Sequence, residues 1–180
     1  MHRIWRDPGP AVKHLSLIGV HAATYGAVWA LSSTGVTLWT VVLALLFMWI
    51  SCSDVIRFEI PDTGALALAV TGIFAASNLQ VAAIGAVLWA SLFWLTAVVS
   101  ARIMGRDALG FGDVKLIAGI GAWLGPIWPI YVVLAATLSA LVILLAHAAL
   151  YRSSAAGTGI AFAPFLCLCA WAIWLWGGGA

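Results

Sequence analysis

The chain has 180 residues, of which 64% are hydrophobic and 8% are charged, and its formal net charge at pH 7 is +2. A soluble domain carries about 25% charged residues, so this composition excludes a protein whose surface faces mainly water. The length suits one compact unit, and the lack of charge predicts an all-α, polytopic bundle of transmembrane helices.

Seven apolar segments follow one another along the chain, at about residues 14–32, 36–53, 63–77, 79–101, 113–125, 127–150 and 159–176. A helix that crosses the bilayer upright needs about 20 residues, with a range of roughly 17–25. The segments at 63–77 and 113–125 are shorter, so each is either a span extended by its flanks or a partly inserted helix. The sequence therefore predicts about six to seven spans.

The basic residues predict the orientation of these spans. If all seven segments cross, every Lys and Arg falls on the side of the N-terminus: Arg3, Arg6, Lys13, Arg57, Arg102, Arg106, Lys115 and Arg152. Cytoplasmic loops carry an excess of Lys and Arg, so the N-terminus is predicted to be cytoplasmic. Losing either short segment as a crossing would scatter the charges over both faces.

The first segment has a second interpretation. Residues 1–13 are basic, residues 15–29 are apolar, and Val28-Trp29-Ala30 resembles a signal-peptidase site, which together are typical of a cleaved signal peptide. We expect an uncleaved first span instead, because further spans follow and the segment is long for a signal peptide.

Metal binding is not predicted. The three cysteines, Cys52, Cys167 and Cys169, form no C-x-x-C pair, so no tetrahedral zinc site is visible. We expect neither a metal nor another cofactor.

The acidic residues carry the chemical information, and all of them fall on the predicted cytoplasmic side: Asp7, Asp54, Glu59, Asp62, Asp107 and Asp113. Ionisable groups in or beside spanning segments are costly and are functional candidates. Asp54 closes the second segment, and Asp113 opens the fifth. The topology brings these two aspartates to the same membrane face.

Each aspartate has a structural alternative to weigh. Gly110 and Gly112 permit positive φ and close approach of another chain, which suits a peptide lying beside Asp113; alternatively, Asp113 caps a helix after a Gly-rich turn. Pro61 and Asp62 are typical of a helix start. Asp54 opposes the dipole of its own helix, so it invites a functional explanation.

Two carboxylates about 4 Å apart interact by roughly 4 kcal/mol at an effective dielectric constant of 20. They would share one proton, so that one carboxylate acts as base on a water while the other donates to a carbonyl oxygen. This is the chemistry of an aspartic protease. Lys115 either favours the ionised form of Asp113 or is an ordinary snorkelling lysine.

Four motifs in order resemble the type IV prepilin leader peptidases, which are membrane aspartyl proteases of the GxGD kind. They are Asp54-x5-Ile60-Pro61-Asp62, Gly110-Phe111-Gly112-Asp113-Val114-Lys115-Leu116, Trp123-Leu124-Gly125-Pro126 and Phe162-Ala163-Pro164-Phe165-Leu166. The resemblance covers roughly residues 37–176. It implies a peptidase-like membrane domain at 37–180, preceded by a cytoplasmic N-terminus and an added span at 1–36.

The resemblance implies a membrane aspartyl endopeptidase that removes the basic leader from prepilins or pseudopilins at the cytoplasmic face of the bacterial inner membrane. Asp54 and Asp113 match its catalytic pair. The supporting positions are Gly110, Gly112, Lys115, Pro61 and Asp62. The implied partners are the prepilin, the pilus assembly machinery and the lipid bilayer, with no nucleic acid.

The chain departs from the family pattern at three places. It has no cytoplasmic loop with two C-x-x-C pairs, so the resemblance does not extend to N-methylation of the product. Asp62 stands where many relatives have asparagine. Residues 161 and 163 are alanine, where the family often has proline and glycine. The short form most resembles the peptidases of tight-adherence (Tad/Flp) pilus systems.

Two other functions remain open from the sequence. One is a small cation-coupled transporter subunit, although transporter sites lie near the bilayer midplane and no acid is predicted there. The other is a catalytically inactive scaffold of a pilus or secretion system. Glu59, Asp62 and Asp107 either attract a basic leader or balance the nearby arginines.

Overall fold

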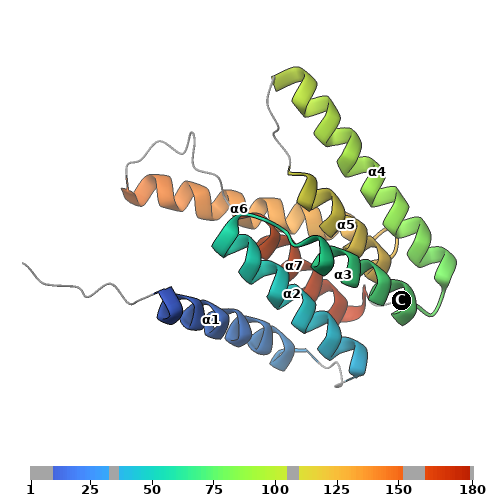
Figure 1. The fold of residues 1–180 in the computed structure, drawn as a ribbon, viewed down its shortest axis with the longest axis horizontal. Helices are drawn as coiled ribbons and strands as arrows, with labels where there is room; N and C mark the ends of the chain where they lie inside the picture. Colours follow the sequence, from blue (N-terminus) through green and yellow to red (C-terminus); the bar gives the residue numbers. More distant parts are fainter. Residues whose placement is uncertain (1–9, 33–36, 105–109, 152–160, 179–180) are drawn as a thin grey trace, which may run out of the picture.

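The computed structural model describes residues 10–32, 37–104, 110–151 and 161–178 (Figure 1). Within these ranges the chain forms seven α-helices and a π-helical turn, and no strand. In chain order they are α1 (Pro10–Ala30), α2 (Leu38–Arg57), α3 (Asp62–Ala75), α4 (Leu79–Met104), α5 (Phe111–Leu124), α6 (Pro129–Tyr151), α7 (Ala163–Ile173) and η1 (Trp174–Gly178). Each helix coincides with one of the seven apolar segments, which confirms the prediction of a helical membrane bundle.

The helices differ in their ability to cross a membrane. Three of those described are long and apolar enough, at Leu38–Arg57, Leu79–Ile103 and Pro129–Ala146. By contrast, α3 and α5 have 14 residues each, which at 1.5 Å per residue is shorter than a hydrocarbon core of about 30 Å. The seven-crossing topology therefore stays a prediction.

Helix α5 lies between α3 and α4 (Figure 1). Most of its side chains from Val114 onward are buried, as expected for a helix that is apolar all round. Gly85 of α4 meets Gly121 of α5 so closely that a Cβ on either would collide with the other's backbone. Small residues let membrane helices approach in this way. The close approach at these two glycines fixes the point at which α4 and α5 cross.

The opposite side of α5 is held by α3. A Cβ on Gly72 would lie 2.7 Å from the Trp123 ring, and the Trp123 indole N–H donates to the carbonyl oxygen of Leu68 at 2.9 Å. A Cβ on Gly119 would likewise meet the Leu68 side chain at 2.8 Å. Helices α3, α4 and α5 thus form one closely packed unit that carries Asp113.

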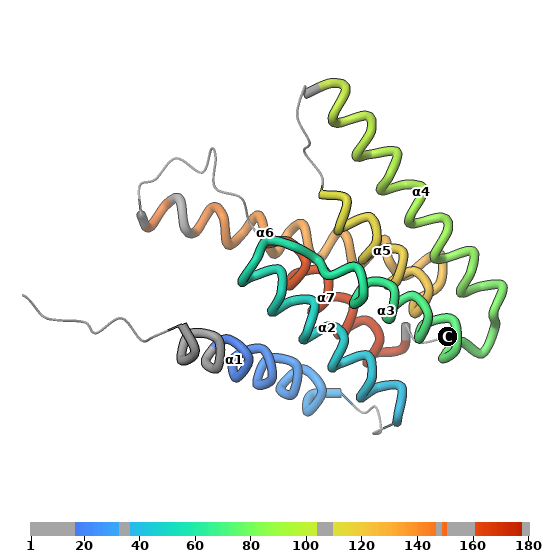
Figure 2. Tube along the Cα trace, viewed as in Figure 1, coloured from blue at the N-terminus to red at the C-terminus, as the bar shows by residue number. Residues whose placement is uncertain are grey.

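The second unit consists of α2 and α7, with α1 along the outside (Figure 2). The Trp171 indole N–H on α7 donates to the carbonyl oxygen of Tyr25 on α1 at 3.1 Å. The Tyr25 hydroxyl lies 3.1 Å from the Ser51 hydroxyl on α2. Hydrogen bonds therefore join α1 to both helices of the unit that carries Asp54.

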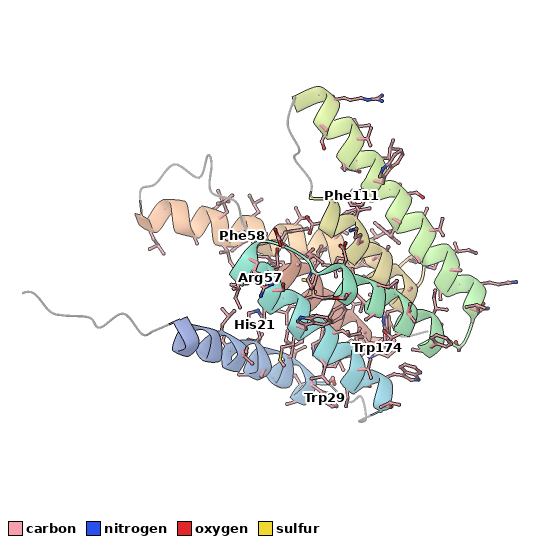
Figure 3. The ribbon with its side chains drawn as sticks, in the orientation of Figure 1. His21, Trp29, Arg57, Phe58, Phe111 and Trp174 are labelled. Atoms are coloured by element: carbon pink, nitrogen blue, oxygen red, sulfur yellow. The ribbon has the colours of Figure 1, made fainter. Side chains whose placement is uncertain are left out.

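The two ends of the bundle have different side chains. Figure 3 places Arg57, Phe58 and Phe111 toward one end, and Trp29 and Trp174 toward the other. The aromatic end contains a perpendicular ring pair, Trp123 and Trp174, with centroids 5.1 Å apart.

The described cations lie near helix ends. Arg57 and Arg102 occupy the last turns of α2 and α4, and Lys115 lies near the start of α5. The orientation of these ends relative to the membrane stays a prediction. The predicted cytoplasmic charges Arg3, Arg6, Asp7, Arg106, Asp107 and Arg152 lie outside the described residues.

Candidate active site

Asp54 lies in the last turn of α2, where the helix ends in a tight cap. Phe58 adopts the left-handed conformation (φ 54°), and its N–H donates to the carbonyl oxygen of Asp54 at 2.8 Å. The Ser53 hydroxyl donates to the carbonyl oxygen of Glu59 at 3.2 Å, so the loop turns back over the helix end. Asp54 is 7% exposed, which makes it a buried carboxylate.

The Asp54 carboxylate has a backbone partner on α7. The N–H of Ala163 donates to Asp54 Oδ2 at 2.9 Å, and Ala163 is the first residue of α7. The first N–H groups of a helix have no partner within it, and the positive end of the helix dipole favours a negative charge. Helix α7 therefore offsets the unfavourable position of Asp54 at the C-terminal end of α2.

Sequence reasoning from residue chemistry does not identify Ala163. Its contribution is a backbone N–H, which every residue except proline possesses. The only sequence signal is the resemblance of residues 162–166 to a family motif. Pro164 marks the start of the helix correctly, because proline fits the first turn.

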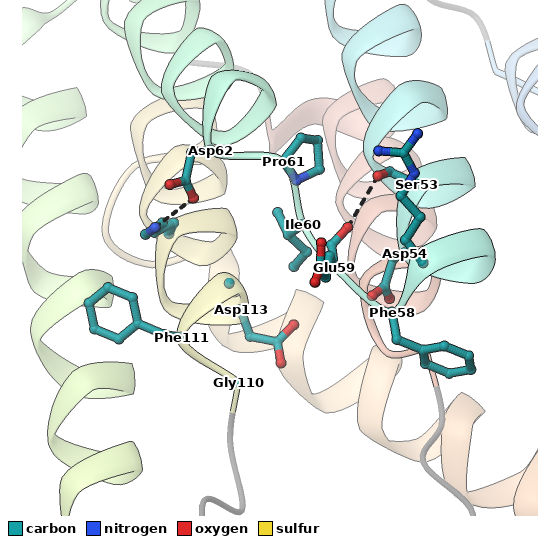
Figure 4. A pocket seen from close by; sticks show the side chains of 13 residues that line it. Ser53, Asp54, Phe58, Glu59, Ile60, Pro61, Asp62, Gly110, Phe111 and Asp113 are labelled. Carbon is teal, nitrogen blue, oxygen red and sulfur yellow. Dashed lines mark hydrogen bonds and ion pairs between the residues drawn. The ribbon is translucent and has the colours of Figure 1, made fainter.

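Asp113 lies in the first turn of α5 and does not cap it. The N-cap residue is Gly110, without a side-chain capping hydrogen bond, and the N–H of Asp113 donates to the carbonyl oxygen of Gly110 at 3.1 Å. The capping interpretation of Asp113 is therefore wrong. Its carboxylate is free to face the pocket, and Figure 4 shows it pointing from α5 toward the side where Asp54 lies.

Of the two glycines before Asp113, Gly112 serves close approach, and the expectation of positive φ is wrong for both. Gly110 has a φ of −66°, and positive φ among the described residues is confined to Phe58, Gly125 and Gly177. A Cβ on Gly112 would lie 3.0 Å from Ile60 Cβ. The loop between α2 and α3 thus rests on the start of α5 and joins the two units.

Asp54 and Asp113 line one pocket of about 610 Å³ (Figure 4). The charge of Asp54 acts on Asp113 across it. The other predicted site residues that line it are Gly110, Gly112, Lys115, Pro61 and Asp62. Arg57 and Glu59 line it as well, so the pocket holds both signs of charge.

Lys115 binds Asp62 rather than Asp113. Its Nζ lies 2.6 Å from Asp62 Oδ1 and 5.2 Å from the centroid of the Phe111 ring. Asp62 is the first residue of α3 and follows Pro61, as the helix-start pattern predicts. The ion pair thus joins the starts of α3 and α5, which sequence spacing alone does not indicate.

A buried polar cluster lies one helical turn below Asp54. Ser51 of α2 is fully buried, lies 3.1 Å from the Tyr25 hydroxyl and also neighbours Cys167 of α7. This cluster consists of Tyr25, Ser51 and Cys167. It connects the two helices that supply Asp54 and Ala163.

Metal ligands do not gather in the part of the chain that the structure describes. No group of three or more His, Cys, Asp or Glu side chains is placed to hold an ion there.

A helical membrane bundle with two facing carboxylates at one end belongs to the class of membrane proteins with a dicarboxylate site. Residues 41–145 match the model of the type IV leader peptidase family. The chain therefore belongs to the type IV leader peptidase family.

Three relatives are each named prepilin leader peptidase/N-methyltransferase. That of Pseudomonas aeruginosa is 34% identical over 77% of this chain and 51% of its own length. That of Pectobacterium carotovorum is 32% identical over 88% of this chain and 57% of its own length. That of Neisseria gonorrhoeae is 32% identical over 87% of this chain and 53% of its own length. The chain thus spans about half the length of the curated relatives it matches. No solved structure matches it significantly.

Proposed function

We propose that this chain is a membrane aspartic endopeptidase that removes the basic leader from type IV prepilins of the Flp type. The observation that carries the proposal is that Asp54 and Asp113, from separate helices, line one pocket and lie within reach of each other's charge. The names of the relatives support the substrate class.

The chemistry proposed for the pocket is general acid–base hydrolysis. Two carboxylates at close range share one proton and titrate as a pair. The ionised member takes a proton from a water as the water oxygen bonds to the peptide carbon. The protonated member gives its proton to the carbonyl oxygen. As the resulting diol collapses, one of its hydroxyls returns a proton to the second carboxylate, the C–N bond breaks, and the amine leaves with the proton taken from the water.

The pocket suits a peptide that is partly basic. Glu59 and Asp62 line it (Figure 4), although Asp62 is already paired with Lys115. Glu59 is therefore the described carboxylate best placed to attract a basic leader. Asp107 stays a candidate for the same role outside the described residues.

The proposed location is the bacterial inner membrane, with the pocket facing the cytoplasm, where prepilin leaders are exposed before pilus assembly. The peptidase domain is proposed to be 37–180 and the added span 1–36. The partners are the prepilin, the pilus machinery and the bilayer. N-methylation, named for the relatives, is not proposed for this chain.

Cleavage of a co-expressed Flp-type prepilin, followed as a mobility shift, tests the function. Wild type should produce the shift, and Asp54→Asn and Asp113→Asn should each abolish it. Asp7→Asn is the matched control, because it makes the same chemical change before α1 and should cleave normally. If the mobility shift survives Asp54→Asn or Asp113→Asn, the substituted aspartate has no part in the mechanism. Failure of correctly inserted wild type to cleave any co-encoded pilin would favour the inactive scaffold.

A further inference from the structure

We propose that the first backbone amide of α7 gives the two aspartates fixed roles in the proposed peptidase. Asp54 is the ionised carboxylate that takes the proton from the attacking water, and Asp113 is the protonated partner that donates to the carbonyl oxygen. Ala163 is then a positioning residue that acts through Asp54. The inference rests on the proposed function and assigns a role to each half of the pair.

The first argument is the asymmetry of the hydrogen bonding. The Ala163 N–H donates to Asp54 Oδ2 at 2.9 Å in a buried setting. An N–H donor stabilises the ionised form of a carboxylate over the protonated form, and hydrogen bonds to charged groups are the stronger ones. Among the described residues, the hydrogen bond recorded to a carboxylate of this pair is the one from Ala163, and it goes to Asp54.

The second argument is the direction of the local helix dipoles. Asp54 lies at the C-terminal end of α2, where a negative charge is unfavourable, and α7 aims its N-terminus at the same carboxylate. Helix-end effects are confined to the first or last turn, and Ala163 is the first residue of α7. The α7 N-terminus therefore cancels the effect of the α2 dipole on Asp54, while Asp113 has the N-terminal end of its own helix α5 in its favour, so the hydrogen bond from Ala163 is the feature that assigns the ionised role to Asp54.

The other ionisable groups around Asp54 do not supply this compensation. From α5 it faces Asp113, and from α7 the Cys167 thiol. Arg57 and Glu59 lie at the same pocket on its own helix end and loop. Lys115 is paired with Asp62. The Ala163 N–H is thus the donor that sets Asp54 apart.

The test removes the Ala163 N–H while keeping the side chain. Replacing Ala163 by lactic acid, through nonsense suppression in the full chain, turns its amide into an ester and deletes the donor. The readout is kcat/KM for prepilin cleavage as a function of pH, whose two limbs report the base and the acid of the free enzyme. Loss of the donor makes Asp54 harder to ionise. The acid limb should therefore move to higher pH by about one to two units, while the alkaline limb stays in place.

A matched ester separates positioning from general loosening of α7. The Leu166 N–H donates to the carbonyl oxygen of Phe162 at 3.3 Å, so an ester at Leu166 weakens the same helical turn without touching Asp54. It should leave both limbs in place. Ala163→Pro is a second way to delete the donor.

The outcomes distinguish this inference from the proposed function. An acid-limb shift with the Ala163 ester, absent in the Leu166 ester, supports the assignment. If wild type cleaves prepilin and the two esters have the same pH profile of kcat/KM, the proposed function stands and the inference is overturned. A shift of the alkaline limb in the Ala163 ester would show that the roles of Asp54 and Asp113 are the reverse of those proposed. If inserted wild type cleaves no prepilin, both fall together.

Discussion

The hydroxyl of Tyr25 lies 3.1 Å from the hydroxyl of Ser51, one helical turn before Asp54. Both side chains are buried, and the carbonyl oxygen of Tyr25 also accepts a hydrogen bond from Trp171. A single residue of α1 therefore contacts both helices that surround the Asp54 carboxylate. Helix α1 is therefore part of the support for the candidate site.

Removing this hydroxyl should lower stability modestly. Tyr25→Phe keeps the ring contact with Trp171 but leaves Ser51 without the Tyr25 hydroxyl, at an expected cost of about 1 kcal/mol. Thermal unfolding in detergent measures the change. Tyr131→Phe is the control, because Tyr131 is 55% exposed, and it should have little effect. Equal midpoints for both variants would show that the buried hydrogen bond contributes nothing.

The helix crossing at Gly85 and Gly121 should tolerate no added methyl group. Gly85→Ala forces α4 away from α5, and overpacking of this kind costs about 1–3 kcal/mol. Gly26→Ala is matched, since a Cβ there meets nothing within 4 Å, and it should be neutral or slightly stabilising because alanine is the better helix former. Unfolding midpoints of the purified proteins give the comparison. A Gly85→Ala variant as stable as Gly26→Ala would contradict the close crossing.

Gly110 and Gly112 should differ in their sensitivity. A Cβ on Gly112 would crowd Ile60 Cβ at 3.0 Å, whereas one on Gly110 would make an ordinary 3.5 Å contact with Asp113 Oδ2. Gly112→Ala should therefore reduce prepilin cleavage more than Gly110→Ala does. Adding Ile60→Gly, which removes the crowded Cβ, to Gly112→Ala should restore part of the lost activity, as contacting sites are coupled. An equal loss of prepilin cleavage in Gly110→Ala and Gly112→Ala would instead show that both positions need the conformational freedom of glycine.

The Asp62–Lys115 ion pair should contribute little to stability. The two side chains are 77% and 37% exposed, and exposed pairs are worth about 0–1 kcal/mol. Asp62→Asn should shift the unfolding midpoint by a degree or two at most, on the order of a few tenths of a kcal/mol. High salt should shrink that difference further. A loss that is large and independent of salt would show that the pair is buried by another component, such as lipid.

Much of the fold is predictable from the sequence because lipid imposes a simple rule. Segments such as 36–53 and 79–101 must bury their backbone hydrogen bonds internally, so an apolar run of that length is a helix. Pro61 and Asp62 locate the start of α3 for equally local reasons. The acid pair is predictable as well, because carboxylates are costly at a membrane and Asp54 opposes its own helix dipole.

The remaining features depend on tertiary contacts that residue types do not encode. The N–H of Ala163 is chemically identical to its neighbours, and only the docking of α7 selects it. Lys115 lies two residues from Asp113 in sequence, yet its partner Asp62 comes from α3. Gly110 and Gly112 suggest special φ values because that is the commonest use of glycine, while the structure uses Gly112 for contact with Ile60.

The hydrogen bond from Ala163 to Asp54 joins residues 109 positions apart, which bears on how the protein is made. When the ribosome has released α2 and even α5, both carboxylates exist but the amide that supports Asp54 has not been synthesised. The pocket therefore reaches its final form only after α7 has packed beside α2. Biosynthesis thus delays completion of the site until the nascent chain has assembled most of its helices.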